Sequence, residues 1–187
     1  PVLREGEQDQ PGGADQGRKL ALGHLSDIMG TAVHSDGRVV INPPRPYIKD
    51  IDTIPFPARH LLSLERYTEK FKNVPFNMRP STFVITSRGC PCDCRFCSIK
   101  SVWGRNWRYH SPKRVVDEIE QVVKDYGVGE IHFVDDNIST KIDRLTAICD
   151  ELLRRKIDIK WATPNGIAIW TLTEEALNKM KKSGCYR

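Results

Sequence analysis

Three short apolar runs alternate with amphipathic stretches over the C-terminal half of the chain. The runs are residues 82–86 (TFVIT), 130–134 (EIHFV) and 159–163 (IKWAT), and their β-branched and aromatic residues are typical of strands. A helical stretch comes after each run, with apolar residues recurring every three or four positions. The pattern therefore predicts three consecutive β/α units.

The helical stretches carry sequence signals at their ends. The first begins at Ser111-Pro112, an N-cap followed by a proline at the first helical position, and Gly127 ends it. For the third helix, Thr171 and Glu174 form a capping box, and Gly184 ends it. The apolar stripes of the three helices contain Val115, Ile119, Val122 and Tyr126; Ile142, Leu145, Cys149 and Leu152; and Leu172, Ala176, Leu177 and Met180.

Strands that alternate with helices form parallel sheets, and their crossovers are right-handed. We therefore expect an α/β fold, a partial (β/α) TIM-like barrel with parallel strands that comprises the first three β/α units. Cys185 lies where a fourth strand is expected to begin.

The N-terminal part of the chain lacks this pattern. Residues 1–20 contain only four aliphatic residues among Gly, Gln and charges, and we expect residues 1–36 to be the poorly ordered tail of an upstream domain. A short strand is expected at 37–42 and a short helix at 61–71. Five prolines within residues 43–57 indicate an extended connector, so we expect a linker at 37–81 and the first half of a barrel at 82–187. Because the chain begins at Pro1 rather than Met, we expect it to be a fragment.

Composition narrows the class of protein. Apolar residues make up 39% of the 187 positions and charged residues 28%, with a formal net charge of +5, an excess too small to indicate a nucleic-acid partner by itself. The chain has no apolar run long enough to span a membrane and no signal-peptide pattern. We therefore expect neither a membrane protein nor a secreted precursor.

Six cysteines occur at positions 90, 92, 94, 97, 149 and 185, and four of them lie within eight residues. A disulfide framework would distribute them along a small secreted chain, so this clustering favours a reducing, cytoplasmic location and a metal site. Cys90, Cys94 and Cys97 offer three thiolates on one loop after a strand, which suits an iron–sulfur cluster. A structural zinc site that uses all four cysteines of the run is the alternative.

The run resembles the signature of the radical S-adenosylmethionine (SAM) family, Cys-x3-Cys-x2-Cys with an aromatic residue, here Phe96, before the last cysteine. Four stretches are similar to the cobalamin-binding branch of that family: INPPRPYIKDIDTIPFP, SRGCPCDCRFC, VVDEIEQVVKDYGVGEIHFVDDN and NGI…LTEEAL…MKKSGC. Residues 4–7 and the stretch GTAVHSDGRVVINPP are similar to the end of its cobalamin domain and the link to the barrel.

The resemblance implies that Cys90, Cys94 and Cys97 hold a 4Fe–4S cluster whose fourth iron binds the amino and carboxylate groups of SAM. Reduction by one electron would cleave SAM to methionine and a 5′-deoxyadenosyl radical, which abstracts hydrogen. Phe96 would present its backbone to the adenine. The remaining cofactor candidates are Asp135, Asp136 and Asn137, where many relatives contact the methionine amine through Gly-Gly-Glu, and Asn165.

For the whole protein, the resemblance implies methylation or rearrangement at an unactivated carbon of a small-molecule substrate. Cobalamin would be bound by an upstream domain whose tail is residues 1–36, and a flavodoxin or ferredoxin type of donor would supply the electron. An RNA-modifying radical SAM enzyme is the alternative within the family. A non-catalytic iron–sulfur or zinc module is the alternative of another class.

Other reactive residues are expected to have structural roles. We expect Cys92 to be a spectator thiol, Cys149 to pack in the core, His132 to be structural and His110 to be solvated; Cys185 has no assigned role. A basic and aromatic stretch has no acid between Ser98 and Val116 and is predicted to cover the cofactor, with stacking on RNA bases as the alternative. Its members are Lys100, Trp103, Arg105, Trp107, Arg108, Tyr109, His110, Lys113 and Arg114.

Overall fold

The computed structural model describes residues 28–63 and 80–187, which fall into two compact units divided between Ile48 and Lys49. The division lies inside residues 37–81, which the sequence predicts to be a linker. The domain boundaries at residues 36 and 81 stay predictions. Within the described residues, no helix is long and apolar enough to cross a membrane.

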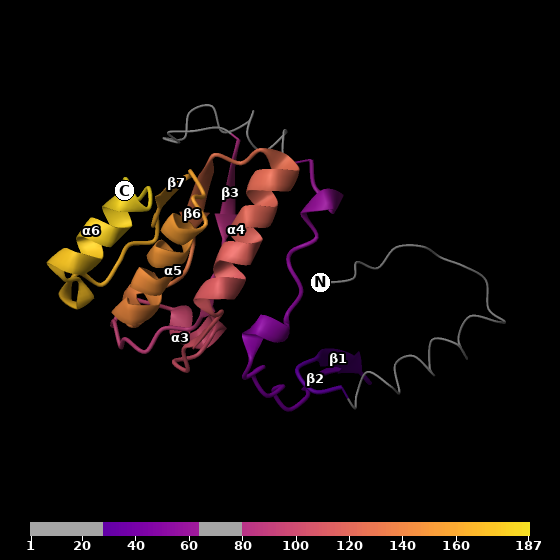
Figure 1. Cartoon of the computed structure of the whole chain (residues 1–187). Coiled ribbons are helices and arrows are strands. Elements are labelled where there is room, and N and C mark those ends of the chain that lie inside the picture. Colours follow the sequence, from indigo (N-terminus) through magenta and orange to yellow (C-terminus); the bar gives the residue numbers. More distant parts are fainter. Residues whose placement is uncertain (1–27, 64–79) are drawn as a thin grey trace. The chain divides into compact units, whose positions relative to one another are not determined.

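The described part of the first unit is a two-stranded antiparallel hairpin (Figure 1), β1 (Ala32–Ser35) and β2 (Arg38–Ile41). Strand β2 lies within the predicted strand at 37–42. Strand β1 was not predicted, although the turn Asp36-Gly37 has positive φ angles of 49° and 75° at both central positions. Such a turn suits the twist of a hairpin, and Asp-Gly is its usual sequence signal.

The second unit contains the predicted β/α units. Strands β3 (Ser81–Val84), β6 (Glu130–Phe133) and β7 (Lys160–Ala162) form a parallel sheet in the order β3-β6-β7. Helices α4 (Pro112–Tyr126), α5 (Ile142–Arg154) and α6 (Glu174–Lys182) follow the strands and lie side by side along the sheet (Figure 1). Cys185 forms a parallel bridge to Trp161, so a fourth strand begins beside β7. The predicted α/β fold is confirmed.

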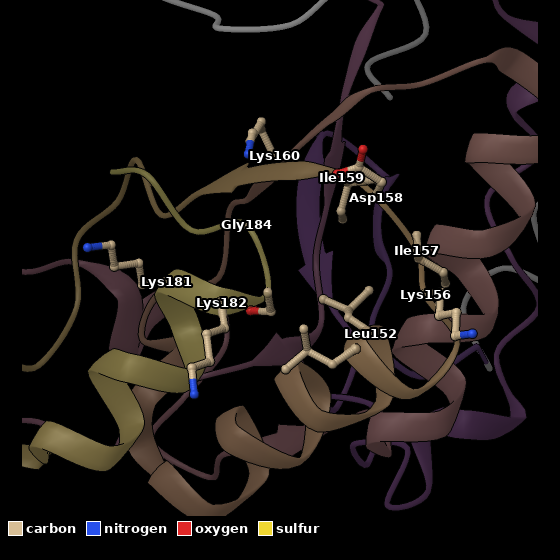
Figure 2. A pocket seen from close by; sticks show the side chains of 11 residues that line it. Leu152, Lys156, Ile157, Asp158, Ile159, Lys160, Lys181, Lys182 and Gly184 are labelled. Atoms are coloured by element: carbon tan, nitrogen blue, oxygen red, sulfur yellow. The ribbon is translucent and has the colours of Figure 1, made fainter.

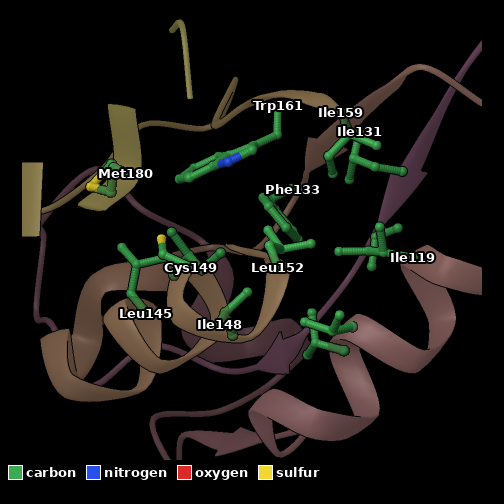
Figure 3. Close-up of a cluster of buried hydrophobic side chains, with 14 of the residues drawn as sticks. Ile119, Ile131, Phe133, Leu145, Ile148, Cys149, Leu152, Ile159, Trp161 and Met180 are labelled. Carbon is green, nitrogen blue, oxygen red and sulfur yellow. The ribbon is translucent and has the colours of Figure 1, made fainter. Parts of the chain in front are cut away.

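The core lies between the sheet and these helices (Figure 3). Alternate strand residues face the helices, and Phe133 contacts Trp161 edge to face with their ring centroids 5.4 Å apart. The Trp161 indole N–H donates to the Ser183 carbonyl oxygen at 3.1 Å, so this large side chain is buried without an unpaired donor. Cys149 is fully buried among these residues, as predicted, and burial raises the pKa of its thiol to about 11.

The N-cap predicted for α4 is confirmed, and the N-cap predicted for α6 is wrong. Ser111 caps α4 by accepting from the Arg114 backbone N–H at 3.2 Å. The predicted capping box at Thr171 is wrong, because Thr173 is the N-cap of α6 and accepts from the Ala176 N–H. Thr171 instead ends a 3₁₀ turn, η4 (Ile169–Thr171), and its hydroxyl donates to the Ala168 carbonyl oxygen.

Residues 49–63 pack against the β/α units. They contain two 3₁₀ turns, η1 (Ile51–Thr53) and η2 (Arg59–Leu61), and Ile51 is buried. The buried Arg59 guanidinium lies 2.7 Å from the Glu118 carboxylate of α4 and also donates to the Phe83 carbonyl oxygen. Leu61 ends η2, and most of the helix predicted at 61–71 falls outside the described residues.

Candidate functional site

The cysteine loop, residues 89–107, begins and ends on a two-stranded antiparallel ribbon at the carboxyl end of β3. The ribbon consists of β4 (Ser87–Arg88) and β5 (Arg108–Tyr109), and the His110 N–H continues the pairing by donating to the Thr86 carbonyl oxygen at 2.9 Å. A short helix, α3 (Ile99–Val102), lies within the loop. The loop therefore leaves the ribbon and returns to it at the carboxyl end of the sheet. Parallel β/α folds have their active sites at this end.

Gly89 allows the two ends of the cysteine loop to lie close together. Its φ is +84°, and a Cβ atom there would lie 2.8 Å from the Asn106 carbonyl oxygen and 2.9 Å from that of Gly104. Both contacts are to backbone, which cannot rotate away, and a side chain at this φ adds strain.

Gly89→Ala is therefore expected to displace the cysteine loop and to reduce the iron bound after anaerobic reconstitution by at least half. Iron and protein assays measure this ratio. Gly166→Ala is the control, because it has a similar positive φ of 94° but open space around its Cβ position. Equal iron loading in Gly89→Ala and wild type would contradict the packing argument.

The four clustered cysteines have different surroundings. Cys90 is 8% exposed, Cys92 and Cys97 are partly exposed and Cys94 is exposed, and none is in a disulfide. The Cys97 N–H donates to the Cys94 carbonyl oxygen at 3.1 Å, which forms a tight turn between two of the predicted ligands. The Cys90 thiol is hydrogen-bonded to the Cys92 side chain, and burial raises its pKa.

Three free thiols on one closed loop fit an iron–sulfur cluster in donor type. Over residues 28–63 and 80–187, no three His, Cys, Asp or Glu side chains are close enough to hold a metal ion together. The thiols of Cys90, Cys94 and Cys97 would therefore have to converge as a cluster binds. The exposure of Cys94 leaves room for that movement.

The predicted adenine contact, Phe96, lies on this loop with its side chain 94% exposed. The loop arms on either side of it are tied by Asp93, which forms ion pairs with Arg105 and, at 3.7 Å, with Lys100. These ion pairs are exposed and contribute little stability. The backbone at Phe96 is therefore held mainly by the Cys94–Cys97 turn.

The three polar residues after β6 have three different environments. The Asp135 carboxylate is 3% exposed and accepts from the Thr86 N–H at 3.1 Å, the Thr86 hydroxyl at 2.8 Å and the Ser87 hydroxyl. Asn137 caps η3 (Ile138–Thr140) by accepting from the Ser139 N–H. The hydrogen bonds of Asp135 thus connect the end of β6 to the start of the ribbon. Asn137 stabilises the loop that follows β6.

Asp136 is partly exposed and differs from both neighbours. Its carboxylate accepts a hydrogen bond from the Gly89 backbone N–H, at the base of the cysteine loop. Burial and the negative charge of Asp135 raise the pKa of Asp136 above its usual value. Of the predicted cofactor residues in this turn, Asp136 is the carboxylate placed beside the cysteine loop.

Asn165 joins the ends of two strands. Its side-chain amide donates to the Val134 carbonyl oxygen at 3.0 Å and to that of Asp135 at 3.3 Å. In the same turn region, the Ala168 N–H donates to the Ser139 hydroxyl. These bonds hold the loop after β7 against the loop after β6.

His110, predicted to be solvated, is 4% exposed, so that prediction is wrong. Its Nδ1 lies 3.1 Å from Asp52 Oδ1 because η1 folds over the start of α4, and burial lowers the pKa of His110. The Ser111 N–H also donates to Asp52 at 2.9 Å. His132 is buried in β6, where its Nε2 lies 2.5 Å from Glu130 Oε1.

The aromatic residues of the basic stretch pack on one another and on a buried arginine that the sequence did not single out. Trp107 stacks on Tyr109 with ring centroids 4.4 Å apart, and the Arg144 guanidinium lies 5.3 Å from the Tyr109 centroid. Arg144 is 5% exposed and donates to the Thr86 and His110 carbonyl oxygens. Trp107 and Tyr109 therefore pack on each other and against α5, and the covering role of this stretch stays a prediction.

A hollow lies at the amino ends of the strands, opposite the end that carries the cysteine loop (Figure 2). It has a volume of about 260 Å³ and lies between the end of α5, the start of β7 and the end of α6. Its lysines, Lys156, Lys160, Lys181 and Lys182, extend in different directions rather than toward one point (Figure 2). The cysteine loop and Asp136 are at the other end of the sheet, so we do not expect this hollow to be the active site.

Three characterised or curated proteins are similar to this chain in sequence. The chain is 36% identical over 162 residues to an uncharacterized methyltransferase of Pyrococcus horikoshii, covering 87% of this chain and 33% of that protein. It is 38% identical to the cytidylyl-2-hydroxyethylphosphonate methyltransferase of Streptomyces wedmorensis, covering 74% and 26%. It is 33% identical to the anaerobic magnesium-protoporphyrin IX monomethyl ester cyclase of Rubrivivax gelatinosus, covering 98% and 32%.

The chain thus spans about a third or less of the length of these curated relatives. The family profile of the radical SAM superfamily matches residues 84–187, from the end of β3 through the cysteine loop and helices α4, α5 and α6. This match covers more than half of the chain and includes the three predicted cluster ligands. The chain therefore belongs to the radical SAM superfamily.

Proposed function

We propose that Cys90, Cys94 and Cys97 hold a 4Fe–4S cluster and that residues 82–187 form the N-terminal half of a catalytic barrel. The observation that supports this most directly is the closed loop of free thiols at the carboxyl end of the first strand. When bound there, the cluster would cleave SAM by one-electron reduction and supply a 5′-deoxyadenosyl radical. Zinc or electron-transfer modules have no need of a neighbouring, partly exposed carboxylate such as Asp136.

The chain's own residues would bind and orient SAM. Asp136 would accept a hydrogen bond from the methionine ammonium, because its carboxylate is partly exposed beside the loop. The Phe96 backbone would contact the adenine. Asp135, Asn137 and Asn165, whose side chains already bond to backbone or hydroxyl groups, would keep the turns after β6 and β7 in place.

For the whole protein we propose methyl transfer to an unactivated carbon of a small-molecule substrate, with cobalamin bound by a domain upstream of residue 37. Two of the relatives described above are named methyltransferases, which favours methyl transfer over rearrangement. A flavodoxin or ferredoxin type of protein would supply the electron, in the cytoplasm. Residues 1–36 would be the tail of the upstream domain and residues 37–81 the linker.

The test uses the full-length protein, reconstituted anaerobically with iron and sulfide and then given SAM, cobalamin and dithionite. Formation of 5′-deoxyadenosine, measured by liquid chromatography and mass spectrometry, is expected in wild type and not in Cys94→Ala. A protein that assembles the cluster but gives neither 5′-deoxyadenosine nor S-adenosylhomocysteine would contradict the proposal.

Residues 1–187 alone are expected not to bind cobalamin at micromolar concentration. The base-off binding signature of this branch is Asp-x-His-x-x-Gly. His34 and Gly37 have the His-x-x-Gly spacing, but Ala32 occupies the position of the Asp, and His24 has Leu22 and Asp27 where Asp and Gly are required. A titration of hydroxocobalamin followed by its visible spectrum makes the measurement. A stoichiometric spectral shift would show that this chain contains a cobalamin site.

A further inference from the structure

Arg88 is a partly buried cation at the base of the cysteine loop. It lies on β4, two positions before Cys90, and its guanidinium lies 5.4 Å from the centroid of the Trp103 ring. Trp103 directly follows α3 on the other arm of the loop. The Arg88 charge therefore lies at the entrance of the loop that carries the cluster ligands.

The neighbouring carboxylates are bonded to other groups. Across residues 28–63 and 80–187, Arg88 makes no ion pair within 4.0 Å, and its one side-chain hydrogen bond there goes to the Ser87 carbonyl oxygen at 3.2 Å. The charged groups that face it are Asp135, Asp136, Glu118 and Arg108. Asp135 accepts from Thr86 and Ser87, Asp136 from Gly89, and Glu118 from Arg59 and Arg114.

The residue directly across the ribbon from Arg88 is a second cation, Arg108. Arg108 donates to the Asn106 and Trp103 carbonyl oxygens on the closing arm of the loop. The charges around Arg88 are of both signs, because Asp135 and Asp136 attract it and Arg108 repels it. A negative group bound in the loop would add to the attraction.

The proposed cluster supplies such a charge. Three thiolates outweigh the positive charge of an oxidised 4Fe–4S core, so the assembly is negative, and reduction by one electron adds a further negative charge. A fixed cation nearby stabilises the reduced form more than the oxidised form, because electrostatic energy grows with the product of the charges.

We propose that the positive charge of Arg88 raises the reduction potential of the cluster and so eases its reduction before SAM is cleaved. This inference rests on the proposed function, since it needs a cluster on Cys90, Cys94 and Cys97. Arg88 acts on the cluster through its charge, and its hydrogen bond to the Ser87 carbonyl oxygen keeps the guanidinium at the base of the loop.

The experiment is a redox titration of the reconstituted full-length protein without SAM, followed by electron paramagnetic resonance of the reduced cluster. In Arg88→Gln and Arg88→Met, the ratio of reduced to oxidised cluster at a fixed potential is expected to fall at least threefold. At 59 mV per tenfold for a one-electron couple, this is a midpoint potential lower by about 28 mV. Arg88→Lys keeps the charge and is expected to stay near wild type.

Two further variants separate charge from packing. Trp103→Leu removes the ring contact but leaves the charge, and Lys113→Gln removes an exposed charge on α4 whose partner is Asp117. Both are expected to keep the wild-type potential. A shift in Lys113→Gln as large as that in Arg88→Gln would show a general charge effect and overturn the assignment.

The remaining outcomes also decide the question. A wild-type potential in Arg88→Gln overturns the inference, and weaker SAM binding in that variant would then assign Arg88 to the SAM carboxylate. If neither Arg88→Gln nor Arg88→Met assembles the cluster but Arg88→Lys does, the need for charge is supported. If Arg88→Lys also fails, the role is structural. Absence of a cluster in wild type would instead refute the proposed function.

Discussion

Single replacement of Cys90, Cys94 or Cys97 with alanine is expected to abolish the 4Fe–4S cluster, the largest effect we predict. Each variant would leave two protein thiolates where three are needed to hold the cluster on one loop. Anaerobic reconstitution of wild type should give a broad brown absorbance and about four irons per chain. The variants should lose the absorbance and most of the iron.

Cys92→Ala is the matched control, because Cys92 lies on the same loop and its side chain contacts the Cys90 thiol. It is expected to keep most of the iron and the absorbance. A loss as severe as that of Cys90→Ala would show that Cys92 is a ligand and would refute the assignment of three. Cys149→Ala tests a thiol in the core, far from the loop in sequence, and should also keep the cluster.

Asp135→Ala is expected to lower the free energy of unfolding by about 3 kcal/mol. The buried carboxylate accepts from the Thr86 N–H and hydroxyl and from the Ser87 hydroxyl, and each lost hydrogen bond costs about 1 kcal/mol. Urea unfolding followed by far-ultraviolet circular dichroism measures the change. Because these bonds hold the start of β4, the variant should also lose cluster occupancy.

Asp136→Ala is the neighbouring contrast and should act on binding instead. Its carboxylate is partly exposed and accepts from Gly89, so its loss should change the free energy of unfolding by about 1 kcal/mol or less. SAM affinity, measured by calorimetry on the clustered protein, should fall at least tenfold. If Asp136→Ala destabilises the protein while Asp135→Ala weakens SAM binding alone, the two roles are assigned the wrong way round.

Arg144 and Asp52 link parts of the chain that are distant in sequence. Arg144 on α5 donates to carbonyl oxygens at Thr86 and His110, and Asp52 accepts from Ser111 at the start of α4. Hydrogen bonds to the Asp52 carboxylate hold its pKa below the usual value, although burial opposes them. The base of the cysteine loop is thereby attached both to the second helix and to the segment that precedes the barrel.

The sequence by itself determined the features that depend on local periodicity and on spacing. The order of the three β/α units from residue 82, the Ser111 cap, the burial of Cys149 and the position of Cys90, Cys94 and Cys97 on one loop all follow from residues a few positions apart. The hydrophobic period of each element decides its type and its buried face. For the same reason the start of a fourth strand at Cys185 was foreseen.

Only the tertiary structure decided which polar residues are bonded to protein and which are available to a ligand. Asp135 and Asp136 are adjacent and chemically identical, yet the strand places one carboxylate against Thr86 and Ser87 and the other beside Gly89. The burial of His110 likewise depends on Asp52, a residue far from it in sequence. Such contacts join distant segments, and a pattern read along the chain contains no information about which segments meet.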